Sequence, residues 1–210
     1  MNDWLLTSRA RGQSTGACDQ EEYEFSRGFT KLHKVLLKID SKCDSIGDYL
    51  ISLRPEEIAA IIDMPDALGR TPLAWAVEYG LTASTELLLK FGANPNQLRF
   101  TKDGGFSPLI HIAIAGPRSA WMDDEIVETV RLLLAAGADI NGTDHEGWTA
   151  LHIAASWSLF RVTDMLYQCG REFLVWDAQT LQGETIFDTC DNTDYRIRYW
   201  GMLNSPMPLI

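Results

Sequence analysis

Apolar residues in the middle of the chain follow two short patterns that alternate along the sequence. In the first, a hydroxyl residue such as Thr71 precedes Leu73 and Ala76, which are apolar and at helical spacing. In the second, a run of leucines at 87–89 ends shortly before Gly92. Apolar residues three and four apart share one face of a helix, and hydroxyl residues and glycines are typical of helix starts and ends. The patterns therefore predict pairs of short helices.

Both patterns recur in one frame. The first occurs as GRTPLAWAVEYG at 69–80, GFSPLIHIAIAG at 105–116 and GWTALHIAASWS at 147–158, with weaker copies at 28–37 and 183–190. The second follows at 86–96, 130–141 and 164–174. Its glycines Gly137 and Gly170 are 33 residues apart, whereas Gly92 and Gly137 are 45 apart. The second spacing exceeds the first by 12 residues. Three of these additional residues lie in the segment 97–104 and the other nine between 116 and 130. The spacing therefore predicts stacked units, one of which has longer loops.

The residues that flank each pattern predict where the helices begin and end. A hydroxyl side chain can accept a hydrogen bond from a free backbone N–H at a helix start, so we expect N-caps at Thr30, Thr71, Ser107, Thr149 and Thr185. Pro72 and Pro108 suit the first helical position, which needs no N–H. Glycine tolerates the left-handed backbone that follows many helices. We expect that conformation at Gly80, Gly92, Gly116, Gly137 and Gly170, with Ser158 in the place of a glycine.

Several of these motifs together resemble the ankyrin repeat family. They are Thr71-Pro72-Leu73, Thr149-Ala150-Leu151-His152, GANPN at 92–96 and GADIN at 137–141. That family has a period near 33 residues, with a β-turn and two helices in each unit. The resemblance implies an all-α solenoid of stacked helix-turn-helix units with β-hairpin loops. Its expected parts are a disordered or arm-like segment 1–27, a degenerate N-terminal capping unit 28–65, repeats 66–98, 99–142 (with an insertion between its helices) and 143–176, and a C-terminal capping unit and tail 177–210.

The histidines and the hairpin aspartates indicate structural rather than catalytic roles. By the resemblance, His152 links its helix start to the backbone of a neighbouring loop, and His33 holds the same place in the first copy. His111 stands one position later in its copy, so we expect a shifted or distorted helix there. Asp66 and Asp144 precede a hairpin glycine by three residues, where a carboxylate can accept hydrogen bonds from turn amides.

Composition narrows the possible partners and environments. The chain has 210 residues, 46% of them hydrophobic, and a formal net charge of −11. Such acidity repels phosphate backbones and anionic membranes, so we expect no nucleic-acid and no membrane partner. No run of about 18 apolar residues is present, and the first residues lack the apolar core of a signal peptide. The four cysteines form no CxxC pair, which favours free thiols in a cytoplasmic or nuclear compartment.

No familiar catalytic or cofactor motif accompanies the repeats. The sequence contains no P-loop or HExxH pattern, and it contains no GxSxG or GxGxxG in a strand–helix setting. We therefore expect no enzyme activity, no cofactor and no metal. One alternative stays open, an enzyme or small-molecule binder whose pocket near the 116–127 insertion uses His111, Trp121 and Asp123. Another is a regulatory subunit that is obligately bound to an enzyme.

The resemblance implies a protein–protein interaction module, monomeric alone, that binds a partner protein through its concave face and hairpin tips. The recognition positions flank each hairpin glycine or lie late in the first helix of a repeat. Here they are Leu68, Arg70, Glu78, Tyr79, Phe106, His145, Glu146, Trp148, Ser156 and Trp157. The same rule also gives Ala67, Asp103, Gly104, Ile114 and Ala115, and in the last unit Leu181, Gln182 and Glu184. Four of the first set are Tyr, Phe or Trp, and such anchors often dominate binding energy.

Overall fold

The computed structural model describes residues 28–39, 45–100, 104–116, 123–170 and 172–204. Within these ranges it contains ten α-helices and one antiparallel sheet of two strands. The helices are α3 (Lys31–Leu36), α4 (Ile46–Ile51), α5 (Pro55–Ile61), α6 (Pro72–Glu78), α7 (Thr82–Lys90), α8 (Leu109–Ala115), α9 (Asp123–Ala135), α10 (Ala150–Ser156), α11 (Phe160–Gly170) and α12 (Thr193–Asn204). The strands are β1 (Leu98–Phe100) and β2 (Phe106–Pro108). The predicted arm 1–27, Asp103 and Trp121 lie outside the described residues.

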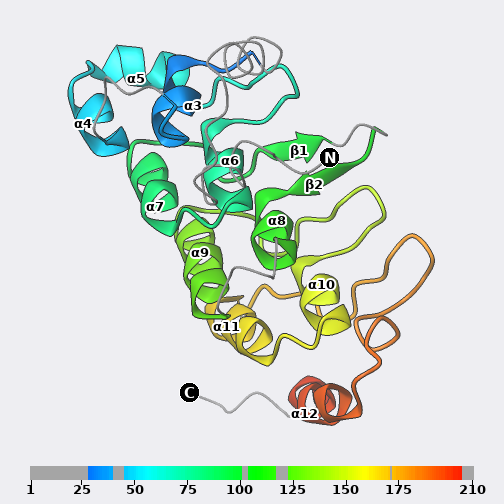
Figure 1. The fold of residues 1–210 in the computed structure, drawn as a ribbon. Helices are drawn as coiled ribbons and strands as arrows, with labels where there is room; N and C mark the ends of the chain where they lie inside the picture. Colours follow the sequence, from blue (N-terminus) through cyan, green and yellow to red (C-terminus); the bar gives the residue numbers. More distant parts are fainter. Residues whose placement is uncertain (1–27, 40–44, 101–103, 117–122, 171, 205–210) are drawn as a thin grey trace, which may run out of the picture.

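The helices stand in two rows, as Figure 1 shows. An inner row runs through α3, α6, α8 and α10, and an outer row runs through α4, α7, α9 and α11. Each repeat contributes one helix to each row, because α6 contacts α7, α8 contacts α9 and α10 contacts α11. The hairpins project from one side of the stack, next to the inner row. This arrangement confirms the predicted solenoid, in which each unit contacts only its neighbours.

Small side chains on the inner helices permit close stacking. Ala76 on α6, Ala113 on α8 and Ala154 on α10 are completely buried, and these three helices contact one another in succession. On the outer row, Leu88 of α7 and Leu133 of α9 are also completely buried. The apolar residues that set the repeat pattern therefore form one continuous core along the stack. Burial of this apolar area supplies the main favourable free energy of folding.

Three of the five predicted N-caps are confirmed. Their hydroxyls accept a hydrogen bond from the backbone N–H three residues later, at Thr30, Thr71 and Thr149. Pro72 occupies the first position of α6, also as predicted. The predictions for Ser107 and Thr185 are wrong, because neither residue caps a helix.

Local pairing removes both residues from a capping role. Ser107 lies in β2 opposite Arg99 of β1. The three extra residues of this hairpin lengthen it, and Pro108 then precedes α8 without a side-chain cap, not inside the helix as predicted. Thr185 instead donates from its amide and its hydroxyl to the Asp188 carboxylate, at 2.8 and 2.7 Å, and the chain turns there instead of forming a helix.

The predicted helix ends are confirmed at Gly80, Gly92 and Gly137, whose φ values are 62°, 92° and 92°. Ser158 takes the same left-handed conformation with φ of 54°. Gly116 has φ of −54°, so the prediction for it is wrong. Gly170 is the last residue of α11 and not a left-handed cap. A Cβ at Gly170 would lie 2.3 Å from Cδ1 of Ile140, so a larger residue there would require the Ile140 side chain to move.

Two asparagines tie successive repeats together after the outer helices. Asn96 donates to the Gly137 carbonyl at 2.9 Å and accepts from the Asp139 amide at 2.8 Å. Asn141 makes the same pair of bonds one repeat later, to the backbone of residues 173 and 175. Each side chain satisfies a backbone donor and a backbone acceptor of the next repeat, which fixes the spacing of the units.

The two ends of the described stack differ from the central repeats. The N-terminal capping unit contains α3 and α4 and an additional helix, α5, which begins at Pro55. The C-terminal unit has a turn at 185–189 and then the single helix α12. Among the helices described, none has the length and apolar character of a membrane span.

Candidate functional site

Two aspartates shape the hairpins that border the inner row. Asp66 Oδ1 accepts hydrogen bonds from the amides of Leu68 and Arg70, at 2.8 and 2.9 Å. Asp144 Oδ1 accepts from the amides of the two corresponding residues, 146 and 148, both at 2.9 Å. The predicted role of these aspartates is therefore confirmed. Both hairpins therefore make the same backbone hydrogen bonds after the aspartate.

His152 and His33 have the structural role that the sequence predicts. The His152 Nδ1 lies 2.8 Å from the Thr149 hydroxyl, and its Nε2 donates to the Glu184 carbonyl at 3.3 Å. His33 bonds in the same way to the hydroxyl of Thr30 and to the carbonyl of residue 70. Both rings are completely buried, and burial lowers the pKa of each below its ordinary value. Neither histidine is placed to take part in chemistry.

His111 differs from the other two buried histidines. Its Nε2 lies 2.9 Å from the Gly142 carbonyl. A carbonyl can only accept, so Nε2 carries the proton and Nδ1 is an acceptor. Nδ1 is buried and has no hydrogen-bond partner among the described residues. Burial lowers the pKa of His111 to about 4, against the opposing influence of Asp144, so the ring is neutral at pH 7.

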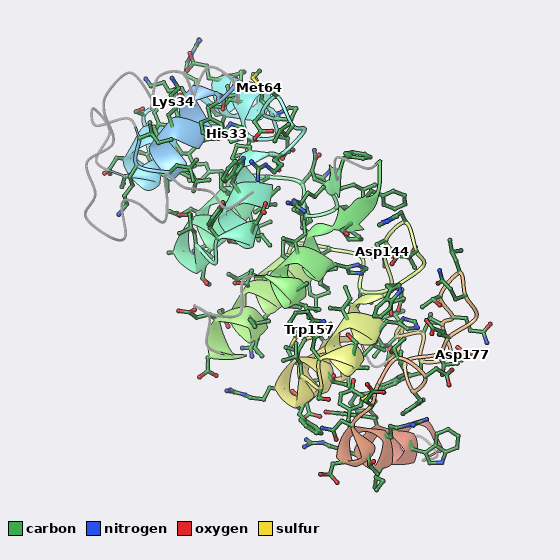
Figure 2. The ribbon with its side chains drawn as sticks, turned by 45° about the vertical axis from the view of Figure 1, so that its right-hand side comes forward. His33, Lys34, Met64, Asp144, Trp157 and Asp177 are labelled. Carbon is green, nitrogen blue, oxygen red and sulfur yellow. The ribbon has the colours of Figure 1, made fainter. Side chains whose placement is uncertain are left out.

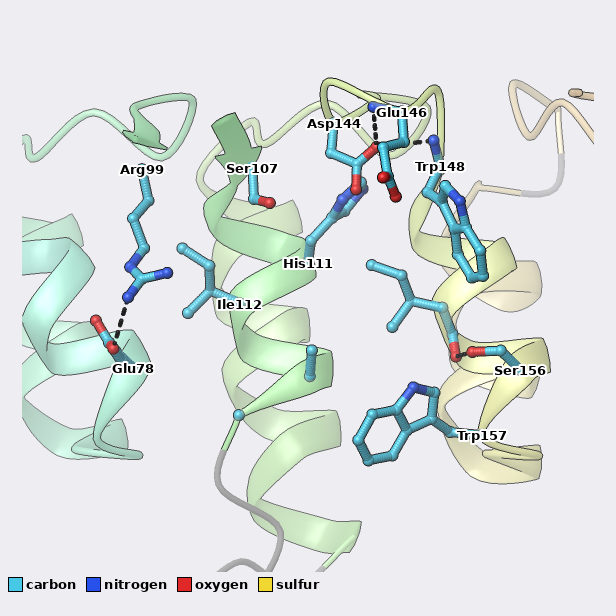
Figure 3. Close-up of a pocket in the computed structure, with 13 residues that line it drawn as sticks. Glu78, Arg99, Ser107, His111, Ile112, Asp144, Glu146, Trp148, Ser156 and Trp157 are labelled. Carbon is cyan, nitrogen blue, oxygen red and sulfur yellow. Dashed lines mark hydrogen bonds and ion pairs between the residues drawn. The ribbon is translucent and has the colours of Figure 1, made fainter. Parts of the chain in front are cut away.

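A pocket of about 440 Å³ opens between the inner helices and the hairpins. Figure 3 shows Glu78 of α6 and Arg99 of β1 on one side, His111 and Ile112 of α8 in the middle, and the side chains of the third repeat on the other side. In Figure 2, Asp144 lies in the hairpin before α10 and Trp157 directly after that helix. The pocket is lined by Glu78, Arg99, Ser107, His111, Ile112, Ala115, Gly116, Asp144, Glu146, Trp148, Ile153, Ser156 and Trp157.

Half of the ten predicted recognition residues line this pocket. They are Glu78, Glu146, Trp148, Ser156 and Trp157. Trp157 is 46% exposed, whereas Trp148 is half-buried and lies against His152 with ring centroids 6.1 Å apart. Two segments far apart in the sequence, the end of α6 and the third repeat, thus face the same space.

Four further recognition residues lie outside the pocket lining and differ in exposure. Leu68 is exposed on the first hairpin. His145 is exposed at a hairpin tip, as predicted, and its ring Nδ1 lies 3.1 Å from the carbonyl oxygen of Phe106. Phe106 is half-buried in β2. Tyr79 is half-buried and stacks on Trp75 with ring centroids 5.3 Å apart.

Arg70 is not a surface residue, and the structure does not place it where a partner could reach it. It is 5% exposed, and its guanidinium lies 3.6 Å from the ring centroid of Trp75. It also forms ion pairs with Asp66 and Glu78, each at 3.4 Å. The nearby acidic and aromatic side chains draw the arginine inward. Ile114, another recognition position that the sequence rule gives, is completely buried on α8.

Arg99 and Asp144 are pocket residues that the recognition pattern did not select. Arg99 lies in the lengthened hairpin and donates to Glu78 at 3.0 Å across 21 residues of sequence. The three additional residues of that hairpin are the sequence signal that could have indicated that Arg99 lies at the pocket. Of the alternative small-molecule site, His111 lines the pocket, Trp121 lies outside the described residues, and the Asp123 side chain is not described. Within the described chain, no cluster of three or more His, Cys, Asp or Glu could hold a metal ion.

Comparison with protein families agrees with this architecture. The ankyrin repeat model matches residues 68–99, and a model for multiple ankyrin repeats matches residues 124–166. The chain is an ankyrin repeat protein. The family predicted from the sequence is thus confirmed. The matched segments span most of the first clear repeat, the outer helix of the second and the larger part of the third.

Three curated proteins illustrate what this ankyrin repeat protein resembles. It is 30% identical over 129 residues to glycerophosphocholine phosphodiesterase gde1 of Schizosaccharomyces pombe, which is 58% of this chain and 10% of that protein. It is 27% identical over 122 residues to NF-kappa-B inhibitor delta of Mus musculus, which is 58% of this chain and 33% of that protein. It is 32% identical over 98 residues to protein phosphatase 1 regulatory subunit 12A of Rattus norvegicus, which is 46% of this chain and 8% of that protein. The chain therefore spans a third or less of each relative.

Proposed function

We propose that this chain is a non-enzymatic interaction module that holds a partner protein against the pocket between α6, α8 and α10. The observation that carries the proposal is the convergence of Glu78, Glu146, Trp148, Ser156 and Trp157 on one pocket. Those positions were selected by sequence as recognition positions. The names of two relatives, an inhibitor and a regulatory subunit, agree with a role in protein interaction.

The pocket has the composition of a binding surface. Tryptophan combines a large apolar area with an indole N–H, and buried indoles are frequent hot spots in protein interfaces. Trp157 remains 46% exposed although it is one of the largest apolar side chains. A partner that covered it would remove apolar area from water, which is favourable.

The likeness to a phosphatase regulatory subunit supports a second candidate, in which the partner is an enzyme that this chain regulates. The likeness to a phosphodiesterase does not support catalysis by this chain, because the chain matches a tenth of that protein. His111, the histidine of the pocket, is buried, and its Nε2 is occupied by a carbonyl. Measurement of a captured enzyme's activity with and without this chain distinguishes a regulated enzyme from other partners.

Affinity capture from the native cell, followed by binding measurements with the purified partner, tests the proposal. Trp157→Ala is the pocket variant. Trp200→Ala on α12 is the matched control, because Trp200 is 61% exposed and does not line the pocket. We expect Trp157→Ala to weaken binding roughly 30-fold, as loss of a tryptophan hot spot does, with little change in thermal unfolding. Unchanged affinity for Trp157→Ala, or an equal loss for Trp200→Ala, would contradict binding at the pocket.

A further inference from the structure

The two ends of the pocket differ in how their negative charges are balanced. At one end, the two carboxylate oxygens of Glu78 pair with Arg99 at 3.0 Å and Arg70 at 3.4 Å. At the other end lie Asp144 and Glu146. Among the residues that the structure describes, no arginine or lysine lies within ion-pair distance of either carboxylate. The negative charge of the pocket is therefore concentrated beside α10.

The first repeat shows what such a hairpin aspartate binds when partners are present. Asp66 uses Oδ1 for the turn amides, while its Oδ2 accepts from the Trp75 indole at 3.0 Å and pairs with Arg70 at 3.4 Å. The Arg70 guanidinium lies over the Trp75 ring. A carboxylate and an indole thus hold a guanidinium inside this same protein, and that combination gains both ion-pair and cation–π energy.

The third repeat keeps the carboxylate and an indole but lacks the cation. Asp144 occupies the position of Asp66 and makes the same turn bonds through Oδ1. The positions that correspond to Arg70 and Trp75 hold Trp148 and Ile153. Oδ2 of Asp144 consequently has no donor among the described side chains, and it faces the pocket with Trp148 beside it (Figure 3).

His111 adds a second, independent sign that this end of the pocket is rich in acceptors. The residue is 2% exposed and lines the pocket, and its ring points toward Asp144 (Figure 3). Its Nε2 is used by the Gly142 carbonyl, so the unpartnered Nδ1 presents a lone pair and not a proton. The hydroxyl of Ser156, a possible donor nearby, already donates to the Ile153 carbonyl at 3.0 Å.

We propose that this end of the pocket receives the positively charged end of an arginine or lysine from the partner protein, held by Asp144 and Glu146 against the indoles of Trp148 and Trp157. The inference rests on the proposed function and names the chemistry of the partner. The charge of the chain, −11 in total, also favours approach of a basic segment. The occupant supplies the cation that Arg70 supplies within the first repeat.

Short peptides test this cation site without knowledge of the partner. The probes are acetyl-Gly-Ala-Xaa-Ala-Gly-amide peptides in which Xaa is arginine, lysine, citrulline or norleucine. Citrulline keeps the shape of arginine without its charge, and norleucine keeps the apolar stem of lysine. Binding is followed through the NMR signals of the indole N–H groups and of backbone amides 144–148. We expect the arginine and lysine peptides to shift these signals, and the two neutral peptides to leave them in place at equal concentration.

Charge-removing variants identify the groups that bind the cation. Asp144→Asn with Glu146→Gln removes both charges, and the new asparagine side chain keeps an oxygen for the turn amides. Glu172→Gln with Asp177→Asn is the matched control, since neither residue lines the pocket. We expect the first pair to weaken binding of the basic peptides about tenfold, and the control pair to change it less than about twofold. Binding should also weaken between about 0.05 and about 0.5 M salt.

Equal binding of norleucine, citrulline and arginine peptides would overturn the proposal, as would full binding to the Asp144→Asn, Glu146→Gln variant. These results are distinguishable from failure of the proposed function. If Trp157→Ala releases the captured partner while the four peptides bind equally, the pocket remains the binding surface and the cation site alone is refuted.

Discussion

The guanidinium of Arg70 lies 3.6 Å from the ring centroid of Trp75, and both side chains are buried. Asp66 joins them, because it accepts from the Trp75 indole and pairs with Arg70. A residue that the repeat pattern selects for recognition therefore stabilises the first repeat from inside. This relationship separates residues that hold the solenoid together from residues that can meet a partner.

Arg70→Ala should lower the free energy of unfolding by about 3 kcal/mol, because it breaks a buried ion pair and leaves Asp66 without its cation. Arg54→Ala is the control. The side chain of Arg54 is 77% exposed and pairs with Glu57 at 3.2 Å, so its loss should cost less than about 0.5 kcal/mol. Urea unfolding measures both. Equal effects would show that burial does not strengthen the Arg70 contacts.

His152→Ala should destabilise the protein by about 2 kcal/mol, because the Thr149 hydroxyl and the Glu184 carbonyl lose a buried partner. His145→Ala should cost about 0.5 kcal/mol or less, since His145 is exposed and its backbone amide still bonds to the Phe106 carbonyl. Denaturant titrations give both values. A neutral His152→Ala variant would refute the structural role of this histidine.

Ser158→Gly should stabilise the protein by up to about 1 kcal/mol, because Ser158 has φ of 54° and glycine adopts that conformation without steric cost. Ser156→Gly is a nearby control with the same change of residue. Ser156 is the last residue of α10, so glycine there should destabilise by roughly 0.5–1 kcal/mol. Differential scanning calorimetry would show melting shifts of opposite sign. Shifts of the same sign would contradict the assigned role of the Ser158 backbone.

Acidification should destabilise the protein partly through His111. Burial lowers its pKa from 6.5 to about 4, and Asp144 opposes the shift. Between pH 6.5 and about pH 4 the unfolded chain binds more protons than the folded chain. The free energy of folding that depends on the neutral His111 ring is therefore fully present above pH 6.5 and is lost as the pH falls towards 4. His111→Gln keeps an N–H for the Gly142 carbonyl but does not titrate. From about pH 7 to about pH 5, wild type should lose about 2 kcal/mol more than this variant. Parallel pH profiles would exclude His111 as the cause.

The helices could be predicted from sequence because their signals are local. Thr71 and Thr149 cap their own helices, and Gly92 and Gly137 end theirs. Ser107 has the same local signal but lies in a strand, because its pairing with Arg99 depends on a lengthened hairpin. Non-local pairing of this kind is not visible in the spacing of the repeat.

The candidate site could be predicted only in part for the same reason. Glu146, Trp148 and Trp157 follow from their register in the repeat, and they do line the pocket. Arg70 has equally favourable register, but its burial depends on Asp66, Trp75 and Glu78 around it. Chemical identity of neighbours, and not position in the repeat, decides which side chains point outward.

We propose that a partner protein is bound at the pocket between α6, α8 and α10. Photo-cross-linking tests it most directly, with p-benzoylphenylalanine placed at Ser156 in the pocket lining or at Arg131, an exposed residue of the outer helix α9. On irradiation with the captured partner, we expect an adduct from position 156 and none from position 131. An adduct from position 131 alone, or equal adducts from both positions, would contradict the claim.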